Sequence, residues 1–221
     1  MSALTLLLSL AGCSINHGVR PLGKGKAAVT GSFGGPIVEV FDAPIPLPLT
    51  QVGARYGVSD RSDVHVGFHP SMLGFFRLVG VDAGASYLVA PQLGPRPALN
   101  VDGTLLFVAG DTAEGDPAGG DRFFGDLAAL ASWSWGDKGH LAYAGLELFA
   151  QPRPWGLYAA PVVGNRFQLG QHLGLSLEAK WWDPWVDAED LTLHYIAPGQ
   201  RGAISLQAGL NVTFGGKEEG S

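Results

Sequence analysis

Apolar and polar residues alternate along most of this chain, and the clearest alternation lies in residues 204–214. The even-numbered positions of that stretch are Ile, Leu, Ala, Leu, Val and Phe, and the odd-numbered positions are Ser, Gln, Gly, Asn and Thr. A period of two residues places each kind of side chain on its own face of a β-strand, which no helix does. The length also matches the roughly 9–11 residues that a tilted strand needs to cross a bilayer. We therefore predict a strand with one face toward hydrocarbon.

The same alternation predicts nine further strands upstream, which makes ten in all. They are expected at about 25–33, 50–58, 64–69, 77–89, 97–109, 122–135, 140–150, 155–168 and 172–182. Every second connection is a short turn, at 59–63, 90–96, 136–139 and 169–171, whereas 34–49, 110–121 and 183–199 are long. Transmembrane barrels have this asymmetry between their two ends. We predict an all-β protein that forms a single antiparallel up-and-down transmembrane β-barrel of about ten strands, with eight as the alternative.

Charged residues on the polar face indicate which face lies inside. The interior of a small barrel suits small residues and paired charges, whereas the outer face of a soluble barrel normally carries many Lys and Glu. Aromatic residues near the strand ends are typical of the two membrane interfaces. We therefore expect the apolar face to meet lipid and the polar face to line the lumen. The predicted lumen polar network consists of Arg55, His65, His69, Asp82, Asp102, Asp126, Glu147, Arg166, Glu178 and Lys180.

Composition agrees with one domain of many strands and tight turns. The chain has 221 residues, of which 33 are Gly and 15 are Pro, and only 15% are charged. The formal net charge is −6, and no basic stripe suited to phosphates occurs. We therefore expect no nucleic-acid partner.

The N-terminus has the pattern of an export signal. Residues 4–12 are an apolar run closed by small residues, too short to span a membrane as a helix, and Cys13, the only cysteine, follows. The sequence Leu10-Ala11-Gly12-Cys13 resembles the lipobox of bacterial lipoproteins. This resemblance implies that residues 1–12 are a lipoprotein signal peptide and that Cys13 is lipidated. It also implies that 13–23 form a lipidated tether, before a barrel at 24–214 and a tail at 215–221.

A second resemblance concerns residues 52–61. The run Val-Gly-Ala-Arg-Tyr-Gly-Val-Ser-Asp-Arg is similar to a hairpin that recurs in small bacterial outer-membrane β-barrel proteins. The resemblance implies the outer membrane of a Gram-negative bacterium. The alternation of short and long connections then places the N-terminus and the short turns on the periplasmic side.

No motif predicts catalysis or a cofactor. Phosphate loops, dinucleotide fingerprints, zinc motifs and nucleophile elbows are absent, so we expect no catalytic residue, metal or cofactor. His65 and His69 share one strand face, but four strand residues span roughly 13 Å, too far for one metal ion. We expect the lumen charges to be structural.

The last long connection is the best candidate for recognition. Exposed aromatic residues beside carboxylates suit a surface that binds protein or glycan, although tryptophans also anchor barrel rims in the membrane interface. The possible recognition loop comprises Trp182, Asp183, Trp185, Asp187, His194 and Tyr195.

These observations favour an outer-membrane β-barrel lipoprotein with a structural, adhesion or surface-complex role. Such a protein contacts membrane lipid and has envelope proteins as its possible partners. The alternatives are an envelope enzyme that acts on lipid or peptide at the barrel rim, and a soluble lipocalin-like lipid-binding lipoprotein. A narrow pore is disfavoured by the charged interior.

Overall fold

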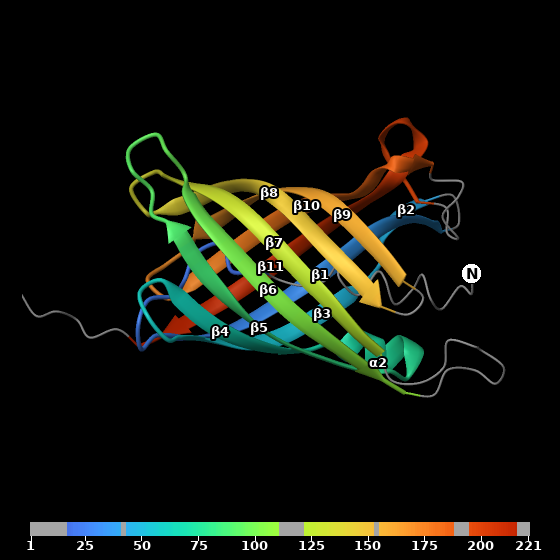
Figure 1. Ribbon diagram of the computed structural model, residues 1–221, viewed down its shortest axis with the longest axis horizontal. Coiled ribbons are helices and arrows are strands. Elements are labelled where there is room, and N and C mark those ends of the chain that lie inside the picture. The colour runs from blue at the N-terminus through green and yellow to red at the C-terminus, as the bar shows by residue number, and fades with distance from the viewer. Residues whose placement is uncertain (1–16, 41–42, 111–121, 153–154, 188–194, 216–221) are drawn as a thin grey trace, which may run out of the picture.

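Ten strands close into an antiparallel barrel (Figure 1). The structure is a computed structural model that describes residues 17–40, 43–110, 122–152, 155–187 and 195–215. Each barrel strand pairs with its neighbours in sequence, and β11 pairs with β1 to complete the circle. The barrel strands are β1 (Ala27–Val40), β3 (Leu49–Gly57), β4 (Ser62–Phe68), β5 (Val79–Ala90), β6 (Ala98–Ala109), β7 (Arg122–Trp135), β8 (His140–Pro152), β9 (Trp155–Gln168), β10 (Leu173–Asp187) and β11 (Arg201–Phe214). The predicted fold class of an all-β antiparallel barrel with ten strands is confirmed.

The apolar face of the alternation lies outside. On β11, Leu206 and Leu210 are 46% and 51% exposed. Ser205 and Gln207, on either side of Leu206, are only 1% and 7% exposed. The other strands follow the same rule. The period of two that defines the strands in the sequence therefore also separates the wall of the barrel from its lumen.

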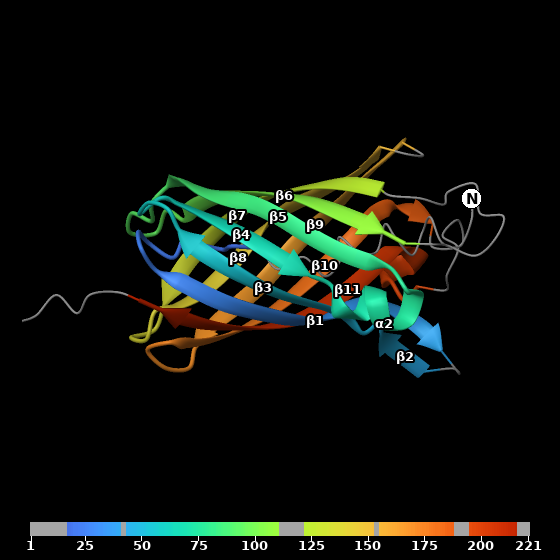
Figure 2. The ribbon, with the colours of Figure 1, turned by 90° about the horizontal axis from the view of Figure 1, so that it is seen from below.

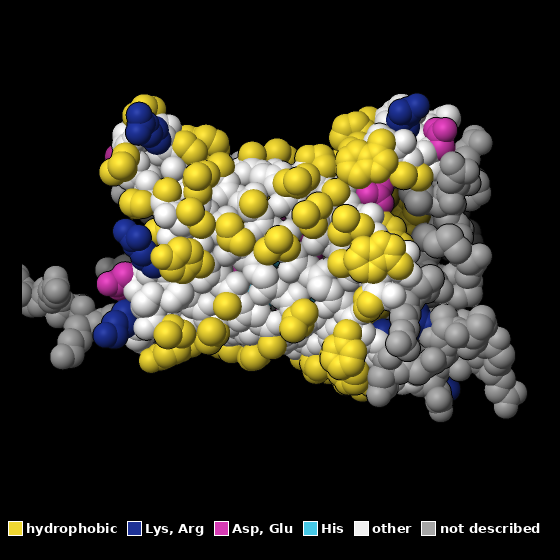
Figure 3. Space-filling view, in the orientation of Figure 1, with side chains coloured by type: hydrophobic (Ala, Val, Ile, Leu, Met, Phe, Trp, Pro, Cys, Tyr) yellow, Lys and Arg dark blue, Asp and Glu magenta, His cyan; other side chains and the backbone are white. Residues whose placement is uncertain are grey.

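The outer wall carries a belt of apolar side chains over the face seen in Figure 3, where charged side chains stand toward the two ends. Among the described residues, every exposed charged side chain lies in a turn or near the end of a strand. Exposed aromatics gather near both rims, with Tyr56, Tyr87, Trp133, Trp135 and Phe214 at one end and Phe33, Phe123, Trp155 and Trp185 at the other. A belt of this kind suits a hydrocarbon layer with an interface on each side.

The two ends of the barrel differ. One, the turn end, has the short connections 58–61, 91–97, 136–139 and 169–172. The other, the loop end, carries α2 (Pro70–Phe76) and β2 (Ala43–Pro46), which lie at the same end in Figure 2. The short helix was not predicted. No helix in the described part of the chain is long and apolar enough to cross a membrane.

Strand β2 occupies part of the long connection predicted at 34–49. It pairs with the last residues of β1, from Ile37↔Pro46 to Val40↔Ala43. Two of its residues, Pro44 and Pro46, cannot donate backbone hydrogen bonds, which suits a strand at the edge of the sheet.

The lumen is filled in layers. At the loop end, inward apolar side chains from eight barrel strands, from α2 and the residue before β5, and from the segment after β10 form one cluster: Val38, Leu49, Met72, Leu78, Leu106, Val108, Phe124, Phe149, Ala160, Trp182, Tyr195 and Ala203. A second cluster consists of Val19, Ala128, Leu130, Leu141, Tyr143 and Val162. Charged and polar side chains lie between and beside these clusters. The barrel therefore has a packed interior.

Strands β9 and β10 separate toward the loop end. Their pairing runs from Gln168↔Gly174 to Val162↔Lys180 and stops, although both strands continue. Pro161 follows at that point on β9, and Pro184 interrupts β10. Asp183 has a positive φ of 44°, and its Oδ1 accepts a hydrogen bond from the Ala159 amide at 3.0 Å. A side chain thus replaces a backbone acceptor where prolines have ended the ladder.

A charge in the apolar belt should destabilise the protein. Leu127 lies near the middle of β7 and is 48% exposed, so L127R places a guanidinium in hydrocarbon and should cost about 2–4 kcal/mol of unfolding free energy. Urea unfolding in lipid vesicles, followed by tryptophan fluorescence, measures the difference.

The matched control is L93R, because Leu93 is 64% exposed but lies in a turn. It should change the unfolding free energy by less than about 0.5 kcal/mol. Equal, small effects of both substitutions would contradict an outer wall that faces lipid.

Candidate functional site

The residues that precede β1 enter the barrel. Residues 17–23, which we call the lumen segment, contact inward-facing side chains of five strands, β3, β4, β6, β7 and β8. The Gly18 amide donates to Asp102 Oδ2 at 3.2 Å, and its carbonyl accepts from Asn100 Nδ2 at 2.5 Å. The Leu22 amide donates to Asp63 Oδ2 at 3.2 Å. These residues belong to the stretch expected as a tether over 13–23, and in the structure they run through the lumen to the turn end.

Two features fit the lumen segment closely to the wall. A Cβ at Gly18 would collide with the guanidinium of Arg55, so the absence of a side chain allows this approach. Arg20 holds the other end, because its Nε and Nη1 donate to Ser132 Oγ and Ser134 Oγ, each at 2.9 Å, and its Nη2 donates to Gln92 Oε1 at 2.7 Å. The segment is thus fixed by directional bonds over its length.

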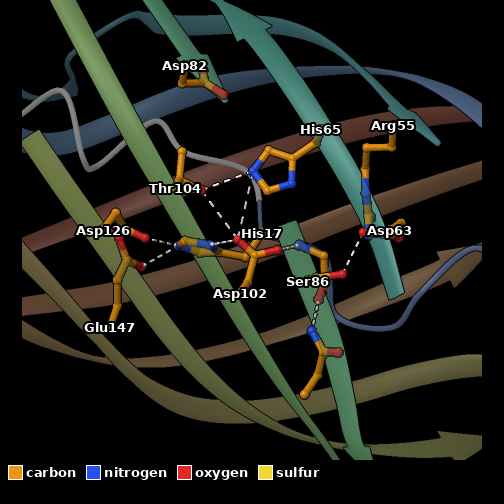
Figure 4. A network of polar contacts seen from close by, with 12 residues as sticks. His17, Arg55, Asp63, His65, Asp82, Ser86, Asp102, Thr104, Asp126 and Glu147 are labelled. Carbon is orange, nitrogen blue, oxygen red and sulfur yellow. Dashed lines mark hydrogen bonds and ion pairs between the residues drawn. The ribbon is translucent and has the colours of Figure 1, made fainter. Parts of the chain in front are cut away.

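His17 lies at the centre of the ionic network (Figure 4). Its Nδ1 is 3.2 Å from Asp102 Oδ1, and its Nε2 is 3.3 Å from Asp126 Oδ1 and 3.1 Å from Glu147 Oε2. All four side chains are fully buried. Three carboxylates therefore surround one imidazole, in an interior where unpaired charge is costly.

The strand register explains why this space exists. Ala128 on β7 pairs with Asp102 on β6 and with Glu147 on β8. Its methyl group is the smallest side chain that the position could carry besides hydrogen. The inward face therefore has room between two carboxylates, and the imidazole of His17 lies among them.

A lysine extends this network across the lumen. Lys180 Nζ lies 2.7 Å from Glu147 Oε2 and 3.4 Å from Glu178 Oε1, and Tyr143 donates its hydroxyl hydrogen to Glu178 Oε2 at 3.0 Å. The ammonium is also 6.0 Å from the ring centroid of Trp182, within cation–π range. Lys180 thus joins the ionic network to the apolar cluster of the loop end.

Two smaller polar clusters lie along β3, β4 and β5. Arg55 Nη2 donates to Asp63 Oδ2 at 2.6 Å, and Ser86 Oγ donates to Asp63 Oδ1 at 2.5 Å. His69 Nε2 lies 2.8 Å from Asp82 Oδ2.

Two further members of the expected network complete the lumen. His65 Nε2 lies 3.0 Å from Thr104 Oγ1 and 3.9 Å from Asp102 Oδ1, which links it to the His17 cluster (Figure 4). Arg166 Nη2 is 2.7 Å from the side-chain oxygen of Asn211 when that amide is turned toward it.

All ten residues expected in the lumen face inward, and the structure sorts them into these groups. It adds three residues that sequence reasoning missed, namely His17, Arg20 and Asp63. The first two precede the alternating pattern, so no period marks them as lumen residues. Asp63 begins a strand next to a turn, where a carboxylate usually meets solvent.

The expected recognition loop differs from the structure in part. Trp182, Asp183 and Tyr195 are buried, at 7%, 8% and 7% exposure, whereas Trp185 and Asp187 are exposed. Trp182 continues the inward series of β10, so strand alternation explains its burial. Asp183 is buried because its backbone takes a positive φ of 44° and its side chain bonds to β9. His194 lies outside the described residues. The six residues therefore do not form one exposed surface.

Neither protein-family models nor curated protein sequences gave a match to this chain. Solved structures with some likeness include Ail, the attachment invasion locus protein of Yersinia pestis, in complex with the heparin analogue sucrose octasulfate (9% identity, TM-score 0.29, 86% of this chain and 99% of that chain). They also include the outer membrane protease OmpT from Escherichia coli (11% identity, TM-score 0.32, 86% and 94%) and a Pseudomonas aeruginosa FadL homologue (11% identity, TM-score 0.33, 87% and 65%). At such scores no activity is carried over.

The Arg55–Asp63 pair offers a test of the lumen network. D63N keeps the shape of the side chain but leaves the Arg55 charge, which is 8% exposed, without its partner. The unfolding free energy should fall by about 3–5 kcal/mol, as when one partner of a buried ion pair is removed.

Urea unfolding in vesicles measures this loss, with D60N as the control because Asp60 lies in an exposed turn. The control should change stability by less than about 0.5 kcal/mol. If D63N were as mild as D60N, the pair would not stabilise the lumen.

Proposed function

We propose that this chain is a sealed, integral β-barrel of a bacterial outer membrane that presents its loop end to the outside. The observation that carries the proposal is the orientation of the faces. Apolar side chains line the outer wall without exposed charge among the described strand interiors, and ionised side chains fill the lumen. A closed barrel leaves no unpaired sheet edge, which is the condition for strands in hydrocarbon.

The filled lumen supports a non-conducting barrel. The lumen segment crosses the region between the two apolar clusters, and Phe124 and Phe149 stack at 5.4 Å between ring centroids in the loop-end cluster. Trp182 meets Phe149 edge-on at 6.4 Å. A porin of 16–18 strands leaves an aqueous channel, whereas a small barrel is filled by side chains.

The same orientation argues against the lipocalin-like alternative. A soluble barrel that binds lipid places apolar side chains around an internal cavity. In this barrel the middle of the lumen holds Asp102, Asp126, Glu147 and Lys180, each at most 5% exposed. The interior has the wrong chemistry for an acyl chain.

The loop end is the surface through which we propose that the barrel acts. It carries α2 and β2, which lie at this end of the barrel (Figure 2). Leu73 on α2, Ile45 on β2 and Ile196 are 49%, 44% and 39% exposed. Exposed apolar side chains outside the membrane belt suit contact with another protein. A role in adhesion or in a surface complex fits this arrangement better than a rim enzyme, because Asp183 is engaged by the Ala159 amide.

Lipidation of Cys13 belongs to the same proposal, and the lumen segment constrains it. Cys13 stands four residues before His17, and four residues span at most about 14 Å when extended. Because the His17 side chain is fully buried in the lumen, a lipid on Cys13 requires the chain to leave the lumen within those few residues. The lipid anchor and the lumen segment would therefore both constrain the path of the chain between Cys13 and His17.

Planar-bilayer recording tests whether the barrel is sealed. Purified protein reconstituted into a planar bilayer should give no conductance steps, because side chains and residues 17–23 fill the lumen. A general porin inserted under the same conditions is the positive control. Reproducible steps from protein whose folded state is verified by its unboiled gel mobility would contradict a sealed barrel.

Single-cysteine labelling tests which end faces outward. L73C at the loop end should react with a membrane-impermeant 5-kDa maleimide on intact cells, whereas L93C at the turn end should react only after the outer membrane is permeabilised. Both sites are well exposed, at 49% and 64%. Labelling of L93C alone on intact cells would reverse the proposed orientation.

The parent chain is the control, because Cys13 is its only cysteine. A lipidated Cys13 has a blocked thiol and stays unlabelled even in denaturant. Labelling of the denatured parent chain would contradict lipidation and leave the orientation result intact.

A further inference from the structure

The His17 cluster has more negative charge than its cations balance. Four carboxylates gather in this region, and His17 and Lys180 face them. When all four are ionised, even a protonated imidazole leaves two negative charges without a cation among the described side chains of the cluster. Those carboxylates are Asp102, Asp126, Glu147 and Glu178. Burial makes uncompensated charge costly, so the cluster is suited to a further cation.

Asp126 shows where that cation would bind. Its side chain is fully buried, yet neither of its oxygens accepts a hydrogen bond within the described part of the chain. Glu147 Oε1 is also without a hydrogen-bond partner there. Buried carboxylate oxygens normally have hydrogen-bond partners. The carboxylates of Asp126 and Glu147 both point toward His17 Nε2 (Figure 4).

His17 is oriented as a metal-binding imidazole is. Its Nδ1 lies 3.2 Å from Asp102 Oδ1, so an Nδ1 hydrogen is donated to that carboxylate and the Nε2 lone pair points toward Asp126 and Glu147. A carboxylate behind the imidazole fixes the tautomer and raises ligand basicity in metal sites. Without a proton or a cation at Nε2, this lone pair would face two carboxylates.

Two of the ligand–ligand distances are close to those of a tetrahedral site with three protein ligands and one open position. Ligand atoms bound to Zn²⁺ at about 2.0–2.2 Å lie about 3.3–3.6 Å from one another in a tetrahedron. His17 Nε2 is 3.3 Å from Asp126 Oδ1 and 3.1 Å from Glu147 Oε2, and one ligand atom from each residue lies within 4.8 Å of the others. Lys180 contacts Glu147 Oε2 at 2.7 Å and so holds that carboxylate in position.

We propose that His17, Asp126 and Glu147 bind a divalent transition-metal ion of the Zn²⁺ class inside the barrel. Asp102 acts as a positioning residue behind His17. The ion joins the lumen segment to β7 and β8 and acts as a staple that keeps the segment in place. The site depends on the barrel interior and not on the proposed surface role, so each can fail without the other.

The site is buried, so the metal should be taken up during folding. Full-length protein is refolded in detergent with one equivalent of Zn²⁺, treated with chelator, desalted and analysed for metal. The wild-type chain should retain about one Zn²⁺, and H17Q and D126N should retain less than a tenth of that. D102N should keep the stoichiometry but bind roughly 10- to 100-fold more weakly.

H69Q is the matched control, because His69 is a buried lumen histidine that pairs with Asp82 and is outside the proposed ligand set. It should bind metal as the wild type does. Each variant must show the gel mobility of the folded barrel without boiling. If a ligand variant fails to fold, refolding of the wild type with Co²⁺ decides the matter, because a tetrahedral site gives intense visible absorption.

Failure of the wild type to retain Zn²⁺ or to develop the Co²⁺ absorption would overturn the proposal. So would equal retention by H17Q and the wild type. Either result would leave His17 as a protonated clamp that pairs with the carboxylates.

Discussion

Closure of the sheet is the constraint on which the rest of this structure depends. Strands β1 and β11 pair from Ala27↔Phe214 to Pro36↔Ser205, and this ladder removes both edges of the sheet. A sheet in hydrocarbon must satisfy its backbone in this way. The seam between β9 and β10 is the exception, and there Asp183 supplies an acceptor to the Ala159 amide. Apart from this seam, the ladders pair each barrel strand with a neighbour on both sides, which suits an apolar outer wall.

A closed barrel of ten strands also has an interior that its own side chains must fill. The inward face must be filled, and every charge on it must find a partner. Apolar clusters fill the loop end and the region around Val19, while the carboxylates in between meet Lys180, Arg55 and His17. The chain uses its own N-terminal residues for part of this task. The N-terminal residues therefore both fill part of the lumen and balance part of its charge.

The sequence predicted the strands and their faces well, because a period of two is a local signal that each strand carries by itself. It could not reveal the partners: His17 meets Asp102 across 85 positions, and Arg20 meets Ser132 across 112. Such pairs depend on register and on a segment that has no alternation of its own. The expected recognition loop was partly wrong for a related reason, because Trp182 continues the inward series of β10 and Asp183 turns to bond with the Ala159 amide of β9. The α2 helix lies in a connection for which no helix was predicted.

The account rests on an outer wall that faces lipid and an inner face that does not. Electron paramagnetic resonance tests this with spin labels along β11, at positions 205, 206, 207, 208 and 210, in a C13S background reconstituted in vesicles. Labels at 206, 208 and 210 should be accessible to lipid-soluble oxygen and shielded from a water-soluble nickel complex, and labels at 205 and 207 should be poorly accessible to both. High nickel accessibility at 206, 208 and 210 would contradict the account, because it would place the apolar face in water.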